Sequence, residues 1–181
     1  LILSLLILLS SSYCKKNWVV LVAGSNGYGN YRHQSDVCHA YHIVRDHGIP
    51  PENIIVMMYD DIANNQNNPF PGKIFNKPDG EDVYEGVEID YKGSQVNPKV
   101  FFNVIKGIKP GVGSDKVIES TEEDKIFIYY TDHGNKGLIA MPSGGMIYAD
   151  DLNDAFTTMY KEKKFQKMLV YIEACYAGSM C

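Results

Sequence analysis

A cysteine and a histidine stand directly after apolar stretches of this 181-residue chain. His133 follows the run "KIFIYYT" and lies in "YYTDHG", whereas Cys175 follows "KMLVYIE" and lies in "YIEACYAGS". A thiolate can attack a carbonyl carbon while an imidazole supplies a proton to the leaving amine. Backbone N–H groups of Gly134 and Cys175 could hold the oxyanion that this attack creates. The two positions therefore predict covalent catalysis by a cysteine–histidine pair.

A purely structural role is the alternative for both residues, because free cysteine is among the most buried residue types. A third polar stretch, "AGSNGYGNYRHQ", contains Asn30, Arg32 and His33. Its glycines lack the spacing of a dinucleotide-binding fingerprint. Arg32 and His33 either point over the same edge of the sheet as the cysteine–histidine pair or form a solvated surface pair.

The elements that must position these residues alternate between buried strands and amphipathic helices. Strands are predicted from continuous apolar runs over 17–25, 53–61, 124–134 and 167–175. Helices are predicted over 35–48, 97–107 and 149–165, the first capped by Ser35 or Asp36. A Gly-Gly turn predicts a hairpin within 137–151, and the residues rich in Asn, Pro and Gly predict a long surface loop over 62–86.

This alternation predicts an α/β fold with a mainly parallel sheet and helices on both of its faces. Functional groups in such sheets gather beyond the carboxyl ends of the strands. Asn30, His133 and Cys175 each follow a different predicted strand. We therefore expect all three at one edge of the sheet.

Composition narrows the classes of partner and cofactor. The formal net charge is -5 and no run of Lys and Arg forms a basic stripe, which argues against a nucleic-acid partner. The four cysteines, Cys14, Cys38, Cys175 and Cys181, include no C-x-x-C pair and make no disulfide framework. We therefore predict no metal site and no cofactor.

The first stretch, "LILSLLILLSSSYC", predicts the remnant of a secretory signal peptide over residues 1–14. It is too short to span a bilayer, and no later segment is long and apolar enough to do so.

Four stretches resemble the legumain family, the asparaginyl endopeptidases of caspase-like fold: "NWVVLVAGSNGYGNYRHQSDVCHAYHIV", "MMYDDIANNQNNPFPGKIFN", "IYYTDHG" and "YIEACYAGSM". The resemblance runs in order from Lys16 to Met180. The catalytic subunit of the GPI transamidase shares the "NYRH" stretch, but "TDHG" and "EAC" look like legumain.

For the chemistry, the resemblance implies that Cys175 is the nucleophile and His133 the catalytic histidine. It also implies that Asn30 orients that histidine and that Gly134 belongs to the oxyanion hole.

For substrate binding, the resemblance implies that Arg32, His33 and Glu173 line the pocket that accepts asparagine. Asp132, an acidic neighbour of the histidine, is grouped with these binding residues. A carboxamide presents an acceptor and two donors, so Arg32 can donate to its oxygen while Glu173 accepts from its nitrogen. We expect aspartate to be accepted only when protonated, and hence at acid pH.

The implied function is a cysteine endopeptidase that cuts after asparagine in protein and peptide substrates, with cystatin-type inhibitors as possible partners. The alternatives are a transpeptidase with the same residues, of peptide-ligase or GPI-transamidase type, and a non-catalytic homologue. The implied location is the secretory pathway, leading to a lysosome, an acidic vacuole or secretion. Residues 15–181 are expected to be the N-terminal part of a caspase-like peptidase domain, truncated after the fourth core strand and inactive alone.

Overall fold

A computed structural model describes residues 15–181, so the expectations for the signal peptide and Cys14 lie outside the described residues. The helices are α1 (Tyr31–Asp46), α2 (Pro98–Lys106) and α3 (Ala149–Lys161). The strands are β1 (Asn17–Ala23), β2 (Ile54–Met57), β3 (Lys125–Thr131), β4 (Gly134–Asn135), β5 (Leu138–Ala140), β6 (Met146–Tyr148) and β7 (Lys167–Glu173). Short 3₁₀ turns cover Tyr28–Asn30, Pro51–Asn53, Gly93–Gln95 and Ala177–Met180.

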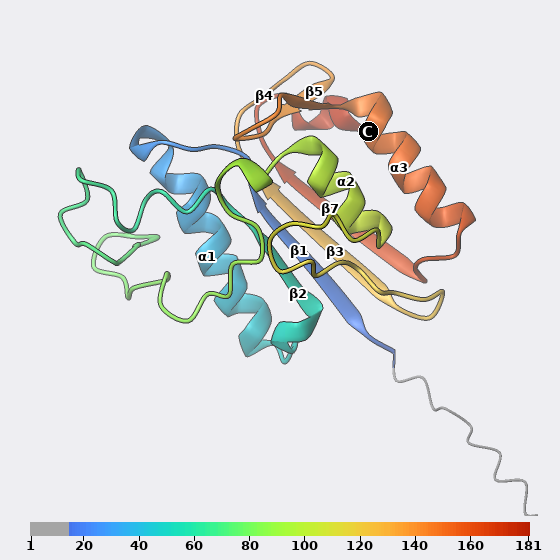
Figure 1. Ribbon diagram of the computed structural model, residues 1–181, viewed down its shortest axis with the longest axis horizontal. Coiled ribbons are helices and arrows are strands. Elements are labelled where there is room, and N and C mark those ends of the chain that lie inside the picture. Colours follow the sequence, from blue (N-terminus) through green and yellow to red (C-terminus); the bar gives the residue numbers. More distant parts are fainter. Residues whose placement is uncertain (1–14) are drawn as a thin grey trace, which may run out of the picture.

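The main sheet has four strands in the order β2-β1-β3-β7, and every neighbouring pair is parallel (Figure 1). In the centre of the sheet, Val20 pairs with Ile55 on one side and with Ile128 on the other. Because all four strands run the same way, their carboxyl ends meet at one edge, which we call the carboxyl rim.

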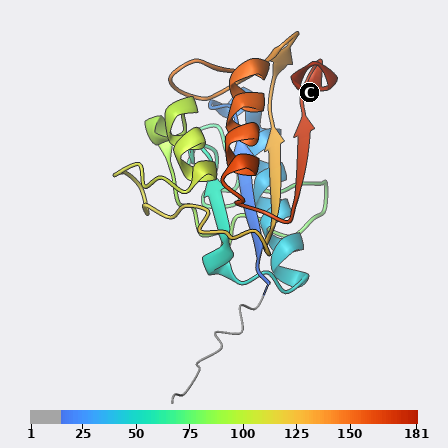
Figure 2. The ribbon, with the colours of Figure 1, turned by 90° about the vertical axis from the view of Figure 1, so that its right-hand side faces the viewer.

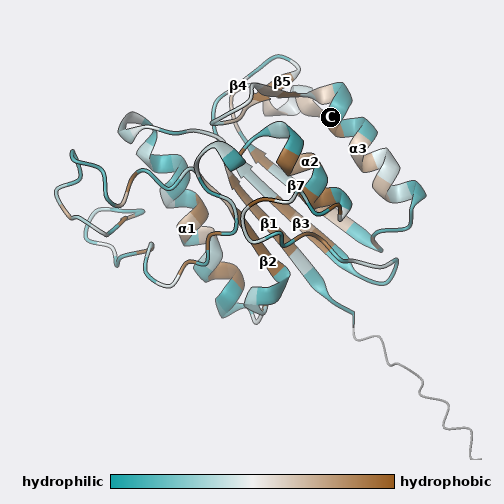
Figure 3. Ribbon diagram, viewed as in Figure 1, coloured by the Kyte–Doolittle hydropathy of each residue, from teal (hydrophilic) through white to brown (hydrophobic). Residues whose placement is uncertain are grey.

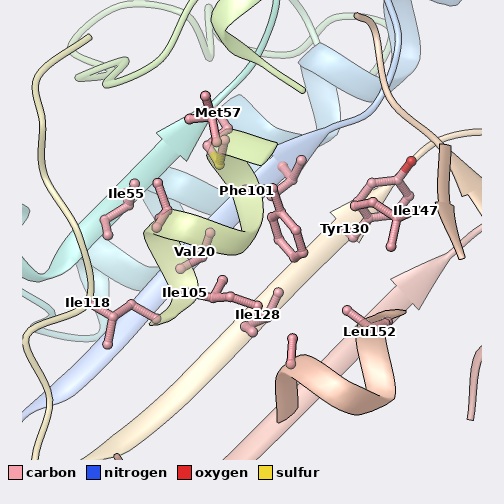
Figure 4. Close-up of a cluster of buried hydrophobic side chains, with 14 of the residues drawn as sticks. Val20, Ile55, Met57, Phe101, Ile105, Ile118, Ile128, Tyr130, Ile147 and Leu152 are labelled. Atoms are coloured by element: carbon pink, nitrogen blue, oxygen red, sulfur yellow. The ribbon is translucent and has the colours of Figure 1, made fainter. Parts of the chain in front are cut away.

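Both faces of the central strand β1 are covered, which explains why β1 is apolar without alternation. Val20 and Val22 pack with Phe101 of α2 and Leu152 of α3 on one face (Figure 4). Val19 and other alternate residues of β1 pack against α1 on the opposite face. Figure 2 shows the sheet lying between these helices, and Figure 3 shows hydrophobic residues along the central strands and a mixture of hydrophobic and hydrophilic residues on the helices. The predicted α/β fold with helices on both faces is confirmed.

The start of α1 differs from the sequence prediction. The helix begins at Tyr31, and neither Ser35 nor Asp36 caps it. The Ser35 hydroxyl instead donates to the carbonyl of Phe75 at 3.0 Å, and the Asp36 carboxylate accepts from the Asn76 amide at 2.8 Å. Both side chains therefore fasten the following long loop to the helix.

The residues at the two ends of α2 were sufficient to predict where this helix begins and ends. Asn97 caps the helix by accepting from the backbone N–H of Val100 at 3.0 Å, and Pro98 occupies the first turn. Gly107 ends the helix in the left-handed region, with φ of 75°.

The predicted loop and hairpin are also confirmed. Residues 62–86 form neither helix nor strand apart from one bridge between Phe75 and Asp82. The buried amide of Asn68 donates to the carbonyl of Ala63 at 2.8 Å, which folds the loop on itself. Strands β5 and β6 form the hairpin, and its turn contains the glycines at 144 and 145 with positive φ.

Within residues 15–181, no helix has the length and apolar character needed to cross a bilayer.

Candidate active site

His133 lies two residues beyond β3, where its side chain meets Asn30 at the end of the turn before α1. The Nε2 atom of His133 lies 2.8 Å from the Oδ1 atom of Asn30. The Nδ2 group of Asn30 donates to the carbonyl of Asn26 at 2.8 Å, so Oδ1 is the free acceptor of this side chain. The hydrogen-bond network therefore assigns the proton of a neutral His133 to Nε2 and leaves Nδ1 as a proton acceptor.

Cys175 occupies the matching position on the neighbouring strand. Thr131 of β3 pairs with Glu173 of β7, and His133 and Cys175 each follow two residues later. The parallel register thus places thiol and imidazole at the same rim, as the sequence predicted.

The exposure of the cysteines separates a reactive thiol from a structural one. Cys175 is exposed, whereas Cys38 is buried with its Sγ atom 3.8 Å from the Sδ atom of Met58. Burial raises the pKa of the Cys38 thiol, because a thiolate there would lose its solvation. The inert, buried role describes Cys38 and does not describe Cys175.

Gly134 approaches the backbone of the Cys175 segment too closely for a side chain. A Cβ atom at Gly134 would lie 2.5 Å from the carbonyl oxygen of Cys175 and 3.1 Å from the Cβ atom of Ala174. Glycine at this position therefore lets the two strand ends come together, and the predicted oxyanion-hole residues are neighbours.

A cluster of buried polar side chains lies beside His133, one of the two predicted catalytic residues. The Nδ1 atom of His33 lies 2.7 Å from the Oγ atom of Ser25 and 3.1 Å from the Oδ1 atom of Asp132. All three residues are buried, and the ring centroids of His33 and His133 lie 5.0 Å apart with the rings nearly perpendicular. Sequence reasoning found His33 and Asp132 but missed Ser25. Its position shortly after β1, at the same rim, is the signal that could have found it.

The other predicted binding residues lie on both sides of this group. Glu173 ends β7, and its carbonyl accepts from the backbone N–H of Asp132 at 3.1 Å, which ties the ends of β3 and β7 together. The Tyr129 hydroxyl donates to the Oε2 atom of Glu173 at 2.9 Å. Arg32 is exposed in the first turn of α1 and forms no ion pair with any of residues 15–181.

Two hollows differ in their relation to the rim. A groove of ≈ 410 Å³ is lined by Asp36, Tyr129 and Glu173 and therefore reaches the carboxyl rim. A larger hollow of ≈ 580 Å³ is lined by the first residues of the strands, including Trp18 and Lys125. That hollow opens near the opposite end of the sheet, away from the cysteine and histidine.

His33, Asp132 and His133 are also potential metal ligands, with donor atoms within 4.8 Å of one another. Both imidazoles already have polar partners, since His33 contacts Ser25 and His133 contacts Asn30, whereas the buried Oδ1 atom of Asp132 lacks a hydrogen-bond partner among residues 15–181. The arrangement can orient imidazoles and exchange protons without an ion, and we assign no metal role to it.

Comparison with known proteins agrees with this geometry. The model of the Peptidase C13 family matches residues 17–181. A vacuolar-processing enzyme delta-isozyme from Arabidopsis thaliana is 58% identical over 165 residues, which cover 90% of this chain and 35% of the plant protein. Legumain from Homo sapiens is 52% identical over 168 residues, covering 91% of this chain and 39% of that protein. Hemoglobinase from Schistosoma mansoni is 55% identical over 163 residues, which cover 90% of this chain and 37% of that protein.

The chain thus spans little more than a third of the length of these relatives. The family match covers nearly all of the described residues, and the parallel sheet agrees with the expected caspase-like fold. The chain belongs to the Peptidase C13 family.

Proposed function

We propose that this chain carries the catalytic residues of a cysteine endopeptidase that cuts peptide bonds after asparagine. The hydrogen bond between His133 and Asn30 is the observation that supports the proposal most strongly, because it frees Nδ1 of an imidazole one strand away from an exposed thiol. The resemblance to legumain and the names of the relatives support the choice of asparagine.

The reaction follows from the assigned tautomer. Nδ1 of His133 takes the thiol proton, and the Cys175 thiolate attacks the carbonyl carbon of the substrate asparagine. The N–H groups of Gly134 and Cys175 stabilise the oxyanion, and the imidazolium returns its proton to the leaving amine as the C–N bond breaks. Water then hydrolyses the thioester and regenerates the thiol. Asn30 holds the ring in place because its oxygen accepts the Nε2–H hydrogen bond in both protonation states.

Selection of asparagine is assigned to Arg32, His33, Asp132 and Glu173. A guanidinium donates to the carboxamide oxygen, and a carboxylate accepts from the carboxamide nitrogen. A bound apolar side chain would shield these exposed charged groups from water without forming hydrogen bonds to them, and a polar group buried without a partner costs about 1–3 kcal/mol. An ionised aspartate would face Glu173 with like charge, so we expect cleavage after aspartate only at acid pH.

We also propose that residues 15–181 are the N-terminal part of a caspase-like peptidase domain. The share of each relative that the chain covers supports this assignment. The similarity to a vacuolar-processing enzyme supports a vacuolar location, and the resemblance to the legumain family supports a lysosomal one. Inhibition by cystatin-type proteins remains an expectation drawn from the resemblance.

Because residues 15–181 are expected to be inactive alone, the test uses the longer protein expected to contain them, after acid activation, in wild-type and Cys175→Ser forms. Both are incubated with a mixed peptide library at about pH 5, which lies above the ordinary carboxyl pKa of aspartate, so that aspartate side chains are mostly ionised. Mass spectrometry would identify the bonds that are cut. Cuts after asparagine that disappear in the variant are the expected result. Joined products in the presence of an added amine would instead indicate a transpeptidase, and no reaction at all would indicate a non-catalytic homologue.

A further inference from the structure

Tyr129 is a polar residue that the proposed mechanism does not use, and its hydroxyl lies near the carboxyl rim. It lies in the central part of β3, where its ring packs in the apolar cluster on the α1 face and only 9% of its surface is exposed. Its hydroxyl nevertheless reaches the carboxylate of Glu173, 2.9 Å away on the neighbouring strand.

The side chain of Glu173 needs a hydrogen-bond partner such as the Tyr129 hydroxyl to be held in one position. It is exposed at the end of β7, and β7 pairs only with β3 within residues 15–181. A glutamate side chain that is free to rotate loses considerable conformational entropy when a ligand fixes it. The rigid phenol of Tyr129 fixes the carboxylate before any ligand arrives, which is the usual structural basis of preorganisation.

The hydroxyl can only act as the donor in this pair. Burial raises the pKa of Tyr129, and the hydrogen bond to Glu173 raises it further. The phenol therefore keeps its proton over the working range of any peptidase, and Oε2 of Glu173 accepts it. The second oxygen, Oε1, is left to accept from another group.

We propose that Tyr129 is a positioning residue for substrate selection: its hydroxyl holds Oε2 of Glu173 so that Oε1 meets the carboxamide nitrogen of the substrate asparagine. This inference rests on the proposed function, because it assigns Glu173 to the asparagine pocket. It adds a buried tyrosine behind the pocket as a determinant of affinity for asparagine.

The chain offers a matched control in Tyr171. Its ring lies on the same face of the sheet as that of Tyr129, with centroids 5.9 Å apart, and it is 56% exposed. Its hydroxyl forms no hydrogen bond among the described residues. Tyr129→Phe and Tyr171→Phe each remove one hydroxyl from the same patch, but only the first removes the hydrogen bond to Glu173.

The experiment measures kcat and KM for an asparagine-containing fluorogenic peptide in the acid-activated longer protein that is expected to contain residues 15–181. The forms compared are wild type, Tyr129→Phe, Tyr171→Phe, Glu173→Gln and the double variant Tyr129→Phe/Glu173→Gln. For Tyr129→Phe we expect KM to rise about tenfold while kcat stays within about twofold, since a positioned charge in the pocket contributes to binding. Tyr171→Phe should leave both constants within about twofold. In the Glu173→Gln background, loss of the Tyr129 hydroxyl should have much less effect, because the two residues act as a unit.

Circular dichroism and the rate of Cys175 alkylation accompany the kinetics. Equal KM values for Tyr129→Phe and Tyr171→Phe, or additive effects in the double variant, would overturn the inference while leaving the proposed function intact. So would a Tyr129→Phe variant that fails to fold, because the hydroxyl would then serve the fold. A wild-type protein that does not cut after asparagine would overturn both.

Discussion

Replacing Asn30 by alanine tests how much the orientation of His133 contributes to the proposed reaction. Within residues 15–181, His133 forms one side-chain hydrogen bond, with the Oδ1 atom of Asn30 at 2.8 Å. The imidazole becomes charged when it takes the thiol proton, and a hydrogen bond to a charged group is worth about 1.5–3 kcal/mol. At about 1.4 kcal/mol for each factor of ten, Asn30→Ala should lower kcat/KM by about 10- to 150-fold.

The assay is steady-state cleavage of an asparagine-containing peptide by wild type, Asn30→Ala and Asn30→Asp. Asn30→Asp keeps an oxygen at the position of Oδ1 and should recover part of the loss. Asn26→Ala is the matched control: the Asn26 amide donates to Pro142 at 2.9 Å, and the carbonyl that accepts from Asn30 belongs to its backbone. A kcat/KM of Asn30→Ala within about twofold of wild type would refute the orienting role, because so small a loss lies far below the loss expected for this hydrogen bond.

Three further outcomes are expected. In the native protein, iodoacetamide should modify Cys175 and leave Cys38 intact, because Cys38 is fully buried and burial raises its pKa; peptide mapping that finds Cys38 equally modified would contradict this. Phe101→Ala should lower the free energy of unfolding by about 3–5 kcal/mol, whereas the 56% exposed Phe70 should tolerate alanine within about 0.5 kcal/mol, both measured by urea denaturation. Asn97→Ala should cost about 1 kcal/mol in the same assay through loss of the α2 cap, and no change would contradict the capping bond.

The elements of the fold were predictable because their signals are local. Strands β1, β2 and β3 are mostly buried apolar runs, β7 alternates half-buried and exposed residues, and α2 has its cap, proline and terminal glycine within or next to its own sequence. The predicted start of α1 was wrong because it depends on contacts between residues far apart in the sequence. Ser35 and Asp36 have the side chains of capping residues, but partners 40 residues further along the chain use those side chains instead. Local propensity gives no information on such competition.

The residues of the candidate site also fall into those that could be predicted from the sequence and those that could not. The rule that functional groups follow parallel strands was enough to predict Asn30, His133 and Cys175 at one edge, although 103 residues separate the first two. The groups behind them were not predictable from any motif. Ser25 is a small polar residue in a glycine-rich turn, and Tyr129 is one of two adjacent tyrosines in an apolar strand. Only the parallel register places the Tyr129 hydroxyl against the carboxylate of Glu173.

The most direct test of the central claim is to trap the nucleophile. A peptide ending in asparagine with an electrophilic ketone in place of the scissile amide would be incubated with the protein, and the adduct would be mapped by mass spectrometry. We predict one adduct, on Cys175, that forms much more slowly in His133→Ala and is absent with a leucine peptide of the same design. An adduct on Cys181, which is also exposed, or equal labelling by the two peptides, would contradict the account.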